Sequence, residues 1–199
     1  MSPVTIASIG EGEGEVSALP KLLHRVAGEL GMAPILTPTP MRVMRGKLTC
    51  TGGIERAVSA IATRVTGSGG VLVVLDADDD CPADLGPRLL IRAQAARPDK
   101  RIAVVLPKRE FEAWYLAAAP SLAGQQGFPD PLLPPGDPEA PRDCKGWLTR
   151  ARRQGHPYKP TVDQAPLASL FDMKMARASS PSFDKFYRDV AWLLGIPRS

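Results

Sequence analysis

Acidic side chains directly follow three apolar stretches of this sequence. The stretches are residues 4–9, 71–75 and 102–106. The acids that follow them are, in order, Glu11, Glu13 and Glu15, then Asp76, Asp78, Asp79 and Asp80, then Glu110 and Glu112. Short apolar runs between turn signals indicate strands buried on both faces, and the carboxyl ends of parallel strands share one edge of a sheet. We therefore expect these acids to gather at one edge.

Carboxylates brought together in this way repel one another. Two like charges 4 Å apart repel by about 4 kcal/mol at an effective dielectric constant of about 20. Such a cluster requires raised pKa values or a cation, and oxygen ligands without histidine favour Mg²⁺ or Mn²⁺. The two histidines lie elsewhere, His24 in a predicted helix and His156 in a basic segment. Metal-assisted phosphoryl chemistry is the expected use of this cluster.

Other interpretations of the acidic stretches stay open. The run 76–80 could be a solvated turn, or the DxD of a phosphatase or nucleotidyl transferase acting on a small phosphate ester. An EF-hand is excluded, because Cys81 and Pro87 stand where that loop requires glycine and glutamate. Glu110 and Glu112 could be helix N-terminal acids favoured by the helix dipole.

Positive charge is concentrated in residues 142–159. This basic strip contains one acid, Asp143, and the following cations: Arg142, Lys145, Arg150, Arg152, Arg153 and Lys159. A positive strip separate from an acidic cluster suits an enzyme that acts on a polyanion. The alternative is a solvated basic helix face.

The elements that must position these residues alternate along the first 119 residues. The sequence predicts strands over 3–9, 71–75 and 102–106, and helices from near Ser17 to Gly31, over 54–65 and over 84–97, with another carrying Phe111 to Leu116. Residues 32–50 contain three prolines and are expected to be extended or to form an edge strand. This alternation indicates an α/β fold with a mainly parallel sheet.

The remaining residues differ in character. Seven of the 21 prolines fall in 120–142, which predicts an irregular loop. Residues 143–199 are predicted to be a helical extension packed on the core, since Ser180 and Pro181 begin a helix with an apolar stripe. The expected organisation is therefore a core over 1–119, a loop over 120–142 and the extension.

Composition indicates an ordinary globular protein, with 44% hydrophobic and 23% charged residues. No apolar stretch approaches the roughly 20 residues needed to span a bilayer, and no basic segment precedes the first apolar run as in an export signal. Cys50, Cys81 and Cys144 are isolated and odd in number, which fits a reducing compartment. We expect a cytoplasmic protein.

Three motifs together resemble a Toprim domain. They are Glu11-Gly12-x-x-Glu15, Asp76-x-Asp78 and the stretch 109–114, Arg-Glu-Phe-Glu-Ala-Trp. The likeness is strongest to small bacterial Toprim-like proteins of unknown function related to the nuclease half of overcoming-lysogenization-defect (OLD) family proteins, and Ser180-Pro181-Ser182-Phe183 is similar to the same group. The resemblance implies a sheet of about four parallel strands with flanking helices.

The resemblance also implies roles for individual residues. Glu11 would be the general acid or base and a metal ligand, Asp76 and Asp78 would bind the first ion, Glu15 would help to hold a second, and Glu112 would complete the cluster. A lysine that steadies transition-state charge is expected in the nuclease relatives. We predict that it is Lys159, with Lys145 as the alternative.

The leading prediction is a Mg²⁺- or Mn²⁺-dependent nuclease that hydrolyses phosphodiesters of DNA or RNA. Lys145, Arg150, Arg152 and Arg153 would hold the nucleic-acid backbone. Relatives often act beside an ATPase in bacterial defence against phage, and because the sequence contains no P-loop, that partner would be a separate protein. The alternatives are a non-catalytic Toprim-fold module that binds nucleic acid or an ATPase, and a metal-dependent phosphatase that uses the run 76–80.

Overall fold

A computed structural model describes residues 3–153 and 156–198, and its centre is a parallel sheet. The strands are β1 (Val4–Gly10), β2 (Ile35–Leu36), β3 (Met41–Arg42), β4 (Gly69–Val74) and β5 (Arg101–Val105). Their order is β2-β1-β4-β5, with β3 also pairing with β1, and every pair is parallel. The predicted α/β fold is therefore confirmed, and the proline-containing segment supplies two short strands beside β1.

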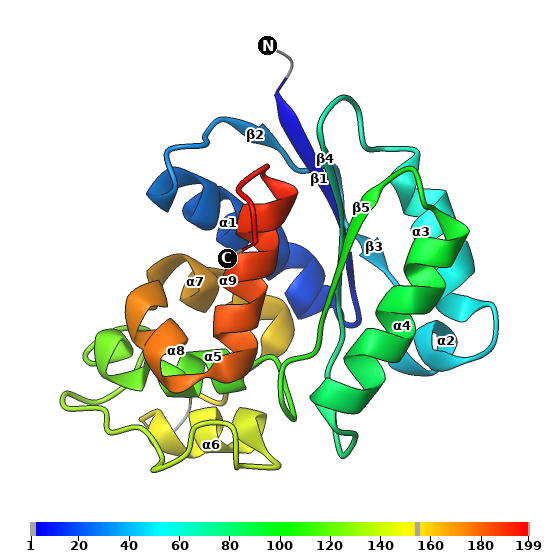
Figure 1. The fold of residues 1–199 in the computed structure, drawn as a ribbon. Helices are drawn as coiled ribbons and strands as arrows, with labels where there is room; N and C mark the ends of the chain where they lie inside the picture. Colours follow the sequence, from blue (N-terminus) through cyan, green and yellow to red (C-terminus); the bar gives the residue numbers. More distant parts are fainter. Residues whose placement is uncertain (1–2, 154–155, 199) are drawn as a thin grey trace.

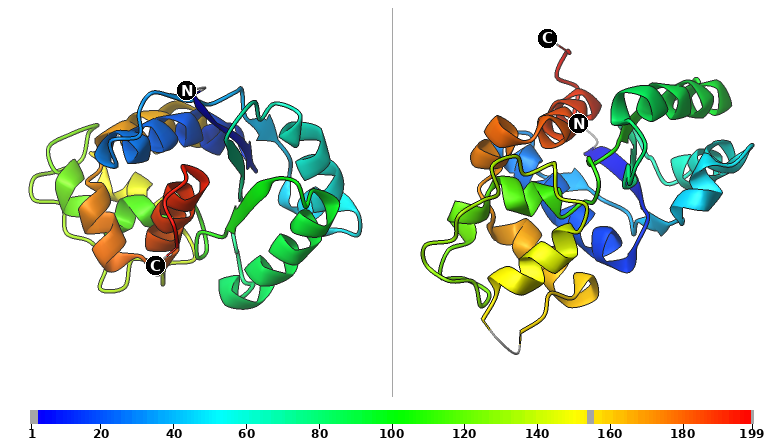
Figure 2. Two further views of the ribbon diagram at one scale, coloured as in Figure 1. Left: turned by 45° about the horizontal axis from the view of Figure 1, so that its top comes forward. Right: turned by 90° about the horizontal axis from the view of Figure 1, so that it is seen from below.

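Helices cover both faces of this sheet (Figures 1 and 2). They are α1 (Glu13–Glu29), α2 (Arg45–Thr49), α3 (Gly53–Ala62), α4 (Pro82–Ala96), α5 (Ala113–Ala117), the 3₁₀ helix η1 (Ala119–Leu122), α6 (Cys144–Ala151), α7 (Pro160–Leu170), α8 (Met173–Ser179) and α9 (Pro181–Leu193). Side chains alternate between the two faces: Leu72 and Val74 pack with α1 and α9, whereas Val71 and Val73 pack with α3 and α4. Both layers are therefore apolar, as a doubly covered sheet requires.

The C-terminal helices share a core with the N-terminal part of the chain. Phe183 and Phe186 of α9 lie in the same buried cluster as Leu22 of α1 and Trp114 of α5. The Trp114 ring lies 5.2 Å from that of Phe183, centroid to centroid, in an edge-on arrangement. Between Ala123 and Asp143, a segment described throughout, the chain forms no helix or strand.

The first helix begins earlier than predicted, at Glu13 instead of near Ser17. Gly12 is its N-cap, and the Glu15 carboxylate accepts a hydrogen bond from the Gly12 N–H. This bond satisfies a donor at the helix start, so the helix can begin about two turns before Pro20 and hold that proline in its interior.

None of the helices in the described parts of the chain combines the length and the apolar character that a membrane crossing requires.

Candidate active site

Acidic residues from three segments meet at the carboxyl edge of the sheet. Glu11 follows β1, Asp76 lies two residues beyond β4, and Glu112 ends the loop between β5 and α5. Glu15 comes from the first turn of α1, and we call these four residues the carboxylate centre. Asp76, Glu15 and Glu112 are all buried, Glu112 completely.

Backbone contacts hold Asp76 in place. The Phe111 N–H donates a hydrogen bond of 2.8 Å to Asp76 Oδ1, which ties the loop after β4 to the loop after β5. The backbone amides of Arg45 and Asp76 also lie beside the Glu11 carboxylate and favour its charged form. Glu11 and Asp76 therefore lie near each other at this edge of the sheet.

Lys145 of α6 brings a cation to this centre. Its Nζ lies 3.4 Å from Glu112 Oε2, 3.9 Å from Asp76 Oδ2 and 3.3 Å from Glu110 Oε1. The backbone N–H of Lys145 also donates to Glu110 Oε2 at 3.1 Å. Glu110 therefore contacts both the backbone N–H and the ammonium group of Lys145. One ammonium group thus faces several carboxylates.

The acids of the centre are electrostatically strained. Burial, the Glu15 and Glu112 carboxylates and that of Glu11 raise the pKa of Asp76 well above its usual range, while Lys145 opposes them. Burial also raises the pKa of Glu112, against the lowering effect of Lys145. Negative charge therefore exceeds the positive charge that Lys145 supplies.

Glu11 shows the same pattern at the more open side of the centre. Burial raises the pKa of Glu11, and the Glu15 and Asp78 carboxylates add to the increase. A raised pKa brings the proton exchange of a carboxyl group closer to neutral pH, which suits a general acid or base.

Lys145 and Tyr158 respond to the same negative charge. Burial lowers the pKa of Lys145, but Glu112, Asp76 and Glu110 outweigh it, and the net pKa is raised. Tyr158 donates a 2.9 Å hydrogen bond to Glu112 Oε1, and burial raises its pKa so that the hydroxyl stays protonated.

The donor set fits a hard divalent cation in its chemistry. Glu11 Oε2 and Glu112 Oε2 are buried without a hydrogen-bond partner. All the atoms of the centre that could bind a metal ion are carboxylate oxygens. Within residues 3–153 and 156–198, however, no three His, Cys, Asp or Glu side chains are arranged as a ligand set. Lys145 lies beside Asp76 and Glu112, and the Glu15 carboxylate turns back to the Gly12 N–H.

Asp78 does not share the buried position of Asp76. Its φ angle is +50°, so the chain is not extended at this residue, and its side chain does not follow the alternation of an extended strand. The Asp78 side chain is 60% exposed and lies 3.4 Å from Arg45 Nε, although it is still close enough to raise the pKa of Glu11.

The predicted lysine, Lys159, is exposed. It is the N-cap residue of α7, and its backbone N–H donates to Asp163 Oδ2 at 2.6 Å. Among the ion pairs of the described residues, Lys145 is the lysine that contacts the acids of the centre. The neighbour of Lys159, Tyr158, is the residue of this segment that reaches inward.

The predicted nucleic-acid contacts divide into exposed and buried residues. Arg150 is exposed and pairs with Asp143 at 3.1 Å, and Arg153 is also exposed. Arg152 has a side chain only 4% exposed, packed on aromatic rings and paired with Asp163 at 3.0 Å, so it is not accessible to nucleic acid. It holds the start of α7 in place.

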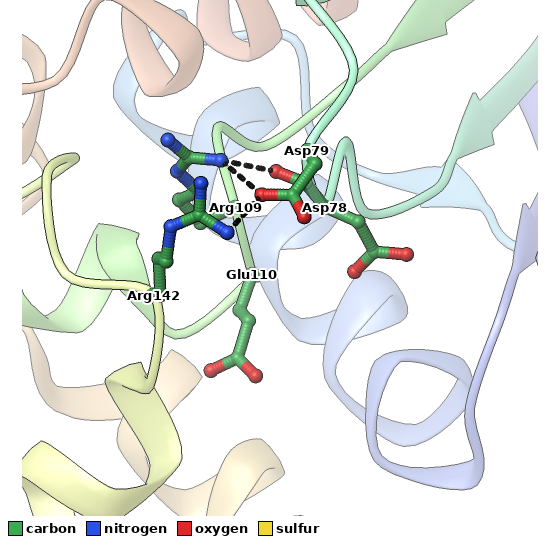
Figure 3. Close-up of a pocket in the computed structure, with 5 residues that line it drawn as sticks. All are labelled: Asp78, Asp79, Arg109, Glu110 and Arg142. Carbon is green, nitrogen blue, oxygen red and sulfur yellow. Dashed lines mark hydrogen bonds and ion pairs between the residues drawn. The ribbon is translucent and has the colours of Figure 1, made fainter.

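A pocket of about 350 Å³ opens beside the centre (Figure 3). Its lining consists of Asp78, Asp79, Arg109, Glu110 and Arg142. Sequence reasoning placed Arg142 in the basic strip but gave no role to Arg109, Arg45 or Tyr158. The bend at Asp78 brings its loop to Arg109 and Arg45, and such a bend has no periodic signal in the sequence.

A family model described as "Domain of unknown function (DUF4276)" matches residues 10–191. The match includes the whole carboxylate centre and the pocket beside it. No curated protein and no solved structure matches the sequence.

Proposed function

The chain belongs to the DUF4276 family, and from its carboxylate centre we propose that it is a metal-dependent nuclease that hydrolyses nucleic-acid phosphodiesters. One observation carries the proposal: the carboxylates of Glu11, Asp76 and Glu112, delivered by three separate strand ends, lie together with raised pKa values. Such a group is costly to assemble for structural reasons alone, and metal-assisted phosphoryl transfer is the chemistry that uses it.

Glu11, Asp76 and Glu112 would hold a Mg²⁺ or Mn²⁺ ion, and Glu15 and Asp78 would contribute to a second. When bound, such ions supply a water of lowered pKa and stabilise charge on phosphoryl oxygens. Glu11 Oε2 is buried without a hydrogen-bond partner and is the atom available to such an ion, whereas Glu112 Oε2 already faces the Lys145 ammonium group at 3.4 Å.

The protein's own side chains perform the remaining steps. Glu11, the most open acid of the centre, has a raised pKa and exchanges a proton with the attacking water or the leaving oxygen. Lys145 holds an ammonium group at the centre, and we assign to it the charge-stabilising role first expected of Lys159. Tyr158 fixes the orientation of the Glu112 carboxylate through its hydrogen bond.

The exposed part of the basic strip, including Arg150 and Arg153, would hold the backbone of DNA or RNA through salt-sensitive contacts. We further propose a cytoplasmic role in defence against phage beside a separately encoded ATPase, which follows from the Toprim resemblance.

Cleavage assays test this function. Labelled single- and double-stranded DNA and RNA are incubated with the protein and Mg²⁺, Mn²⁺ or EDTA. We expect cleavage that requires a divalent ion and falls at least about 100-fold in Glu11→Gln and in Asp76→Asn, the loss typical of a removed acid–base group. Glu29→Gln, which changes an acid at the other end of α1, is the control.

Three results would contradict the proposal. Cleavage that survives Glu11→Gln and Asp76→Asn together would remove the mechanism, and metal-independent binding without cleavage would identify a non-catalytic module. Turnover of a small aryl phosphate that depends on Asp76 and ignores Glu11 would instead indicate a phosphatase.

A further inference from the structure

Two arginines share one carboxylate at the mouth of the site (Figure 3). Asp79 Oδ1 lies 2.7 Å from a terminal nitrogen of Arg109 and 2.7 Å from one of Arg142. The three residues come from the loop after β4, the loop after β5 and the end of the segment 120–142. Distant parts of the chain thus bring two guanidinium groups to one wall of the pocket.

The backbone around Arg109 is held in a conformation that few residues adopt. Its φ angle is +69°, and Asp78 opposite has a φ angle of +50°. Two 3.0 Å hydrogen bonds join them: the Asp78 N–H donates to the Arg109 carbonyl, and an Arg109 guanidinium N–H donates to the Asp78 carbonyl. Such conformations concentrate at ligand clamps, where the surroundings enforce them.

The arginines have donors that Asp79 does not satisfy. Arg109 Nε is buried and has no hydrogen-bond partner. The other acids of the pocket have cations of their own, because Asp78 pairs with Arg45 and Glu110 with Lys145. Asp79 is therefore the single acid placed between the two guanidinium groups, and its side chain is largely exposed.

We propose that Arg109 and Arg142 form a phosphate clamp, in which Asp79 holds the place that a backbone phosphate of the nucleic acid takes when it binds. A planar guanidinium group donates in parallel to a carboxylate or to a phosphate, so one can replace the other. The inference rests on the proposed nuclease function and locates a phosphate next to the one that is cleaved. Asp79 swings toward solvent as the phosphate enters.

Binding measured without metal tests the clamp separately from cleavage. A fluorescent single-stranded oligodeoxynucleotide of about 12 nucleotides, within the range of single-strand site sizes, is titrated in EDTA and followed by anisotropy. We expect Arg142→Gln to bind about tenfold more weakly, as the loss of a charge-assisted bond implies, and its salt dependence to fall by about one phosphate contact. Asp79→Asn is expected to bind several-fold more tightly than the wild type.

Arg97 and Asp99 provide matched controls. They form a pair at the same distance, 2.7 Å, near the opposite end of β5, in which Asp99 is exposed and Arg97 is partly buried. Asp99→Asn and Arg97→Gln change the net charge as the test variants do, and we expect them to leave the affinity unchanged. Inorganic phosphate is added as a competitor. A site for free phosphate would release the oligonucleotide at a low phosphate concentration, whereas a site for the nucleic-acid backbone would not.

The clamp is overturned if Asp79→Asn binds no more tightly than Asp99→Asn, if Arg142→Gln binds no more weakly than Arg97→Gln, or if free phosphate displaces the oligonucleotide at low concentration. These results leave cleavage by the wild type intact and so reject the clamp alone. If the wild type shows no metal-dependent cleavage, the nuclease function is rejected, whatever the binding results. Arg142 is 70% exposed, and its substitution is not expected to disturb folding.

Discussion

Removing the Lys145 ammonium group would leave the buried acids of the site without their cation. Its Nζ lies within 4 Å of oxygens on Asp76, Glu110 and Glu112. Breaking a buried ion pair from one side costs about 3–5 kcal/mol, whereas exposed pairs contribute about 1 kcal/mol or less. The Lys145 side chain is about one third exposed, so we expect Lys145→Met to lower the free energy of unfolding by about 2 kcal/mol at neutral pH.

The loss depends on pH in a defined direction. The pKa values of Asp76 and Glu112 are raised in the folded protein above their ordinary values of 3.8 and 4.5, mainly by burial. The folded state therefore binds more protons than the unfolded state. The free energy of unfolding falls as the pH rises from the ordinary pKa values of the unfolded state through the raised pKa values of the folded state. Without Lys145 both pKa values rise further, so the deficit is small near pH 4 and largest at neutral pH.

Urea unfolding of the wild type and the variant, at several values of pH between 4 and 7 without divalent ions, measures this difference. Lys185→Met is the matched control, because Lys185 is similarly exposed and pairs with one buried acid, Asp189, which keeps Arg198 as a second partner. We expect a loss of about 1 kcal/mol or less in the control. A deficit in Lys145→Met that equals the control, or that does not change with pH, would refute the electrostatic reasoning.

Three further predictions concern packing, hydrogen bonding and metal. Gly14→Ala should destabilise the protein by about 1–3 kcal/mol in urea unfolding, because the added Cβ would overlap the side-chain oxygen of Gln164 in α7. Gly28→Ala meets no atom within 4 Å and should be neutral or stabilising. Tyr158→Phe should cost about 2 kcal/mol, since it leaves the buried Glu112 carboxylate without its hydroxyl donor, and Tyr187→Phe, whose partner is exposed, should cost less. Mg²⁺ at 100 times its Kd should raise the free energy of unfolding by about 2.7 kcal/mol relative to EDTA, and no change in thermal unfolding would count against a metal site.

The sheet could be predicted from the sequence because its strands are buried on both faces. The run 71–75 has no alternation and stands between turn signals, so its length and composition identify a parallel strand. The position of Asp76 follows from the strand end by geometry alone. The two-residue strands β2 and β3 carry no comparable pattern, since pairing with β1 decides them.

The finer details of the site depended on contacts between distant residues. Lys159 and Lys145 both stand in a basic strip, and no local signal states which of them turns inward. The choice is made by Glu110, which holds Lys145 through both its backbone N–H and its ammonium group. Arg152 shows the same limit, because its burial depends on Asp163 and on nearby rings.

The alternating acids and glycines of residues 10–15 have separate functions despite their regular spacing. Glu11 faces the centre, Glu13 points outward to Arg42, and Glu15 caps the helix start. Gly14 has a different role, since the absence of a side chain lets α1 approach Gln164 of α7 closely.

That close approach has a consequence for the chemistry. Tyr158 lies two residues before α7, so the distance between α7 and α1 also determines whether its hydroxyl reaches Glu112. A side chain at position 14 would push α7 outward and weaken this bond. Loss of the tyrosine contact and loss of packing should therefore occur together in Gly14→Ala, and combining that substitution with Tyr158→Phe should cost less than the sum of the two.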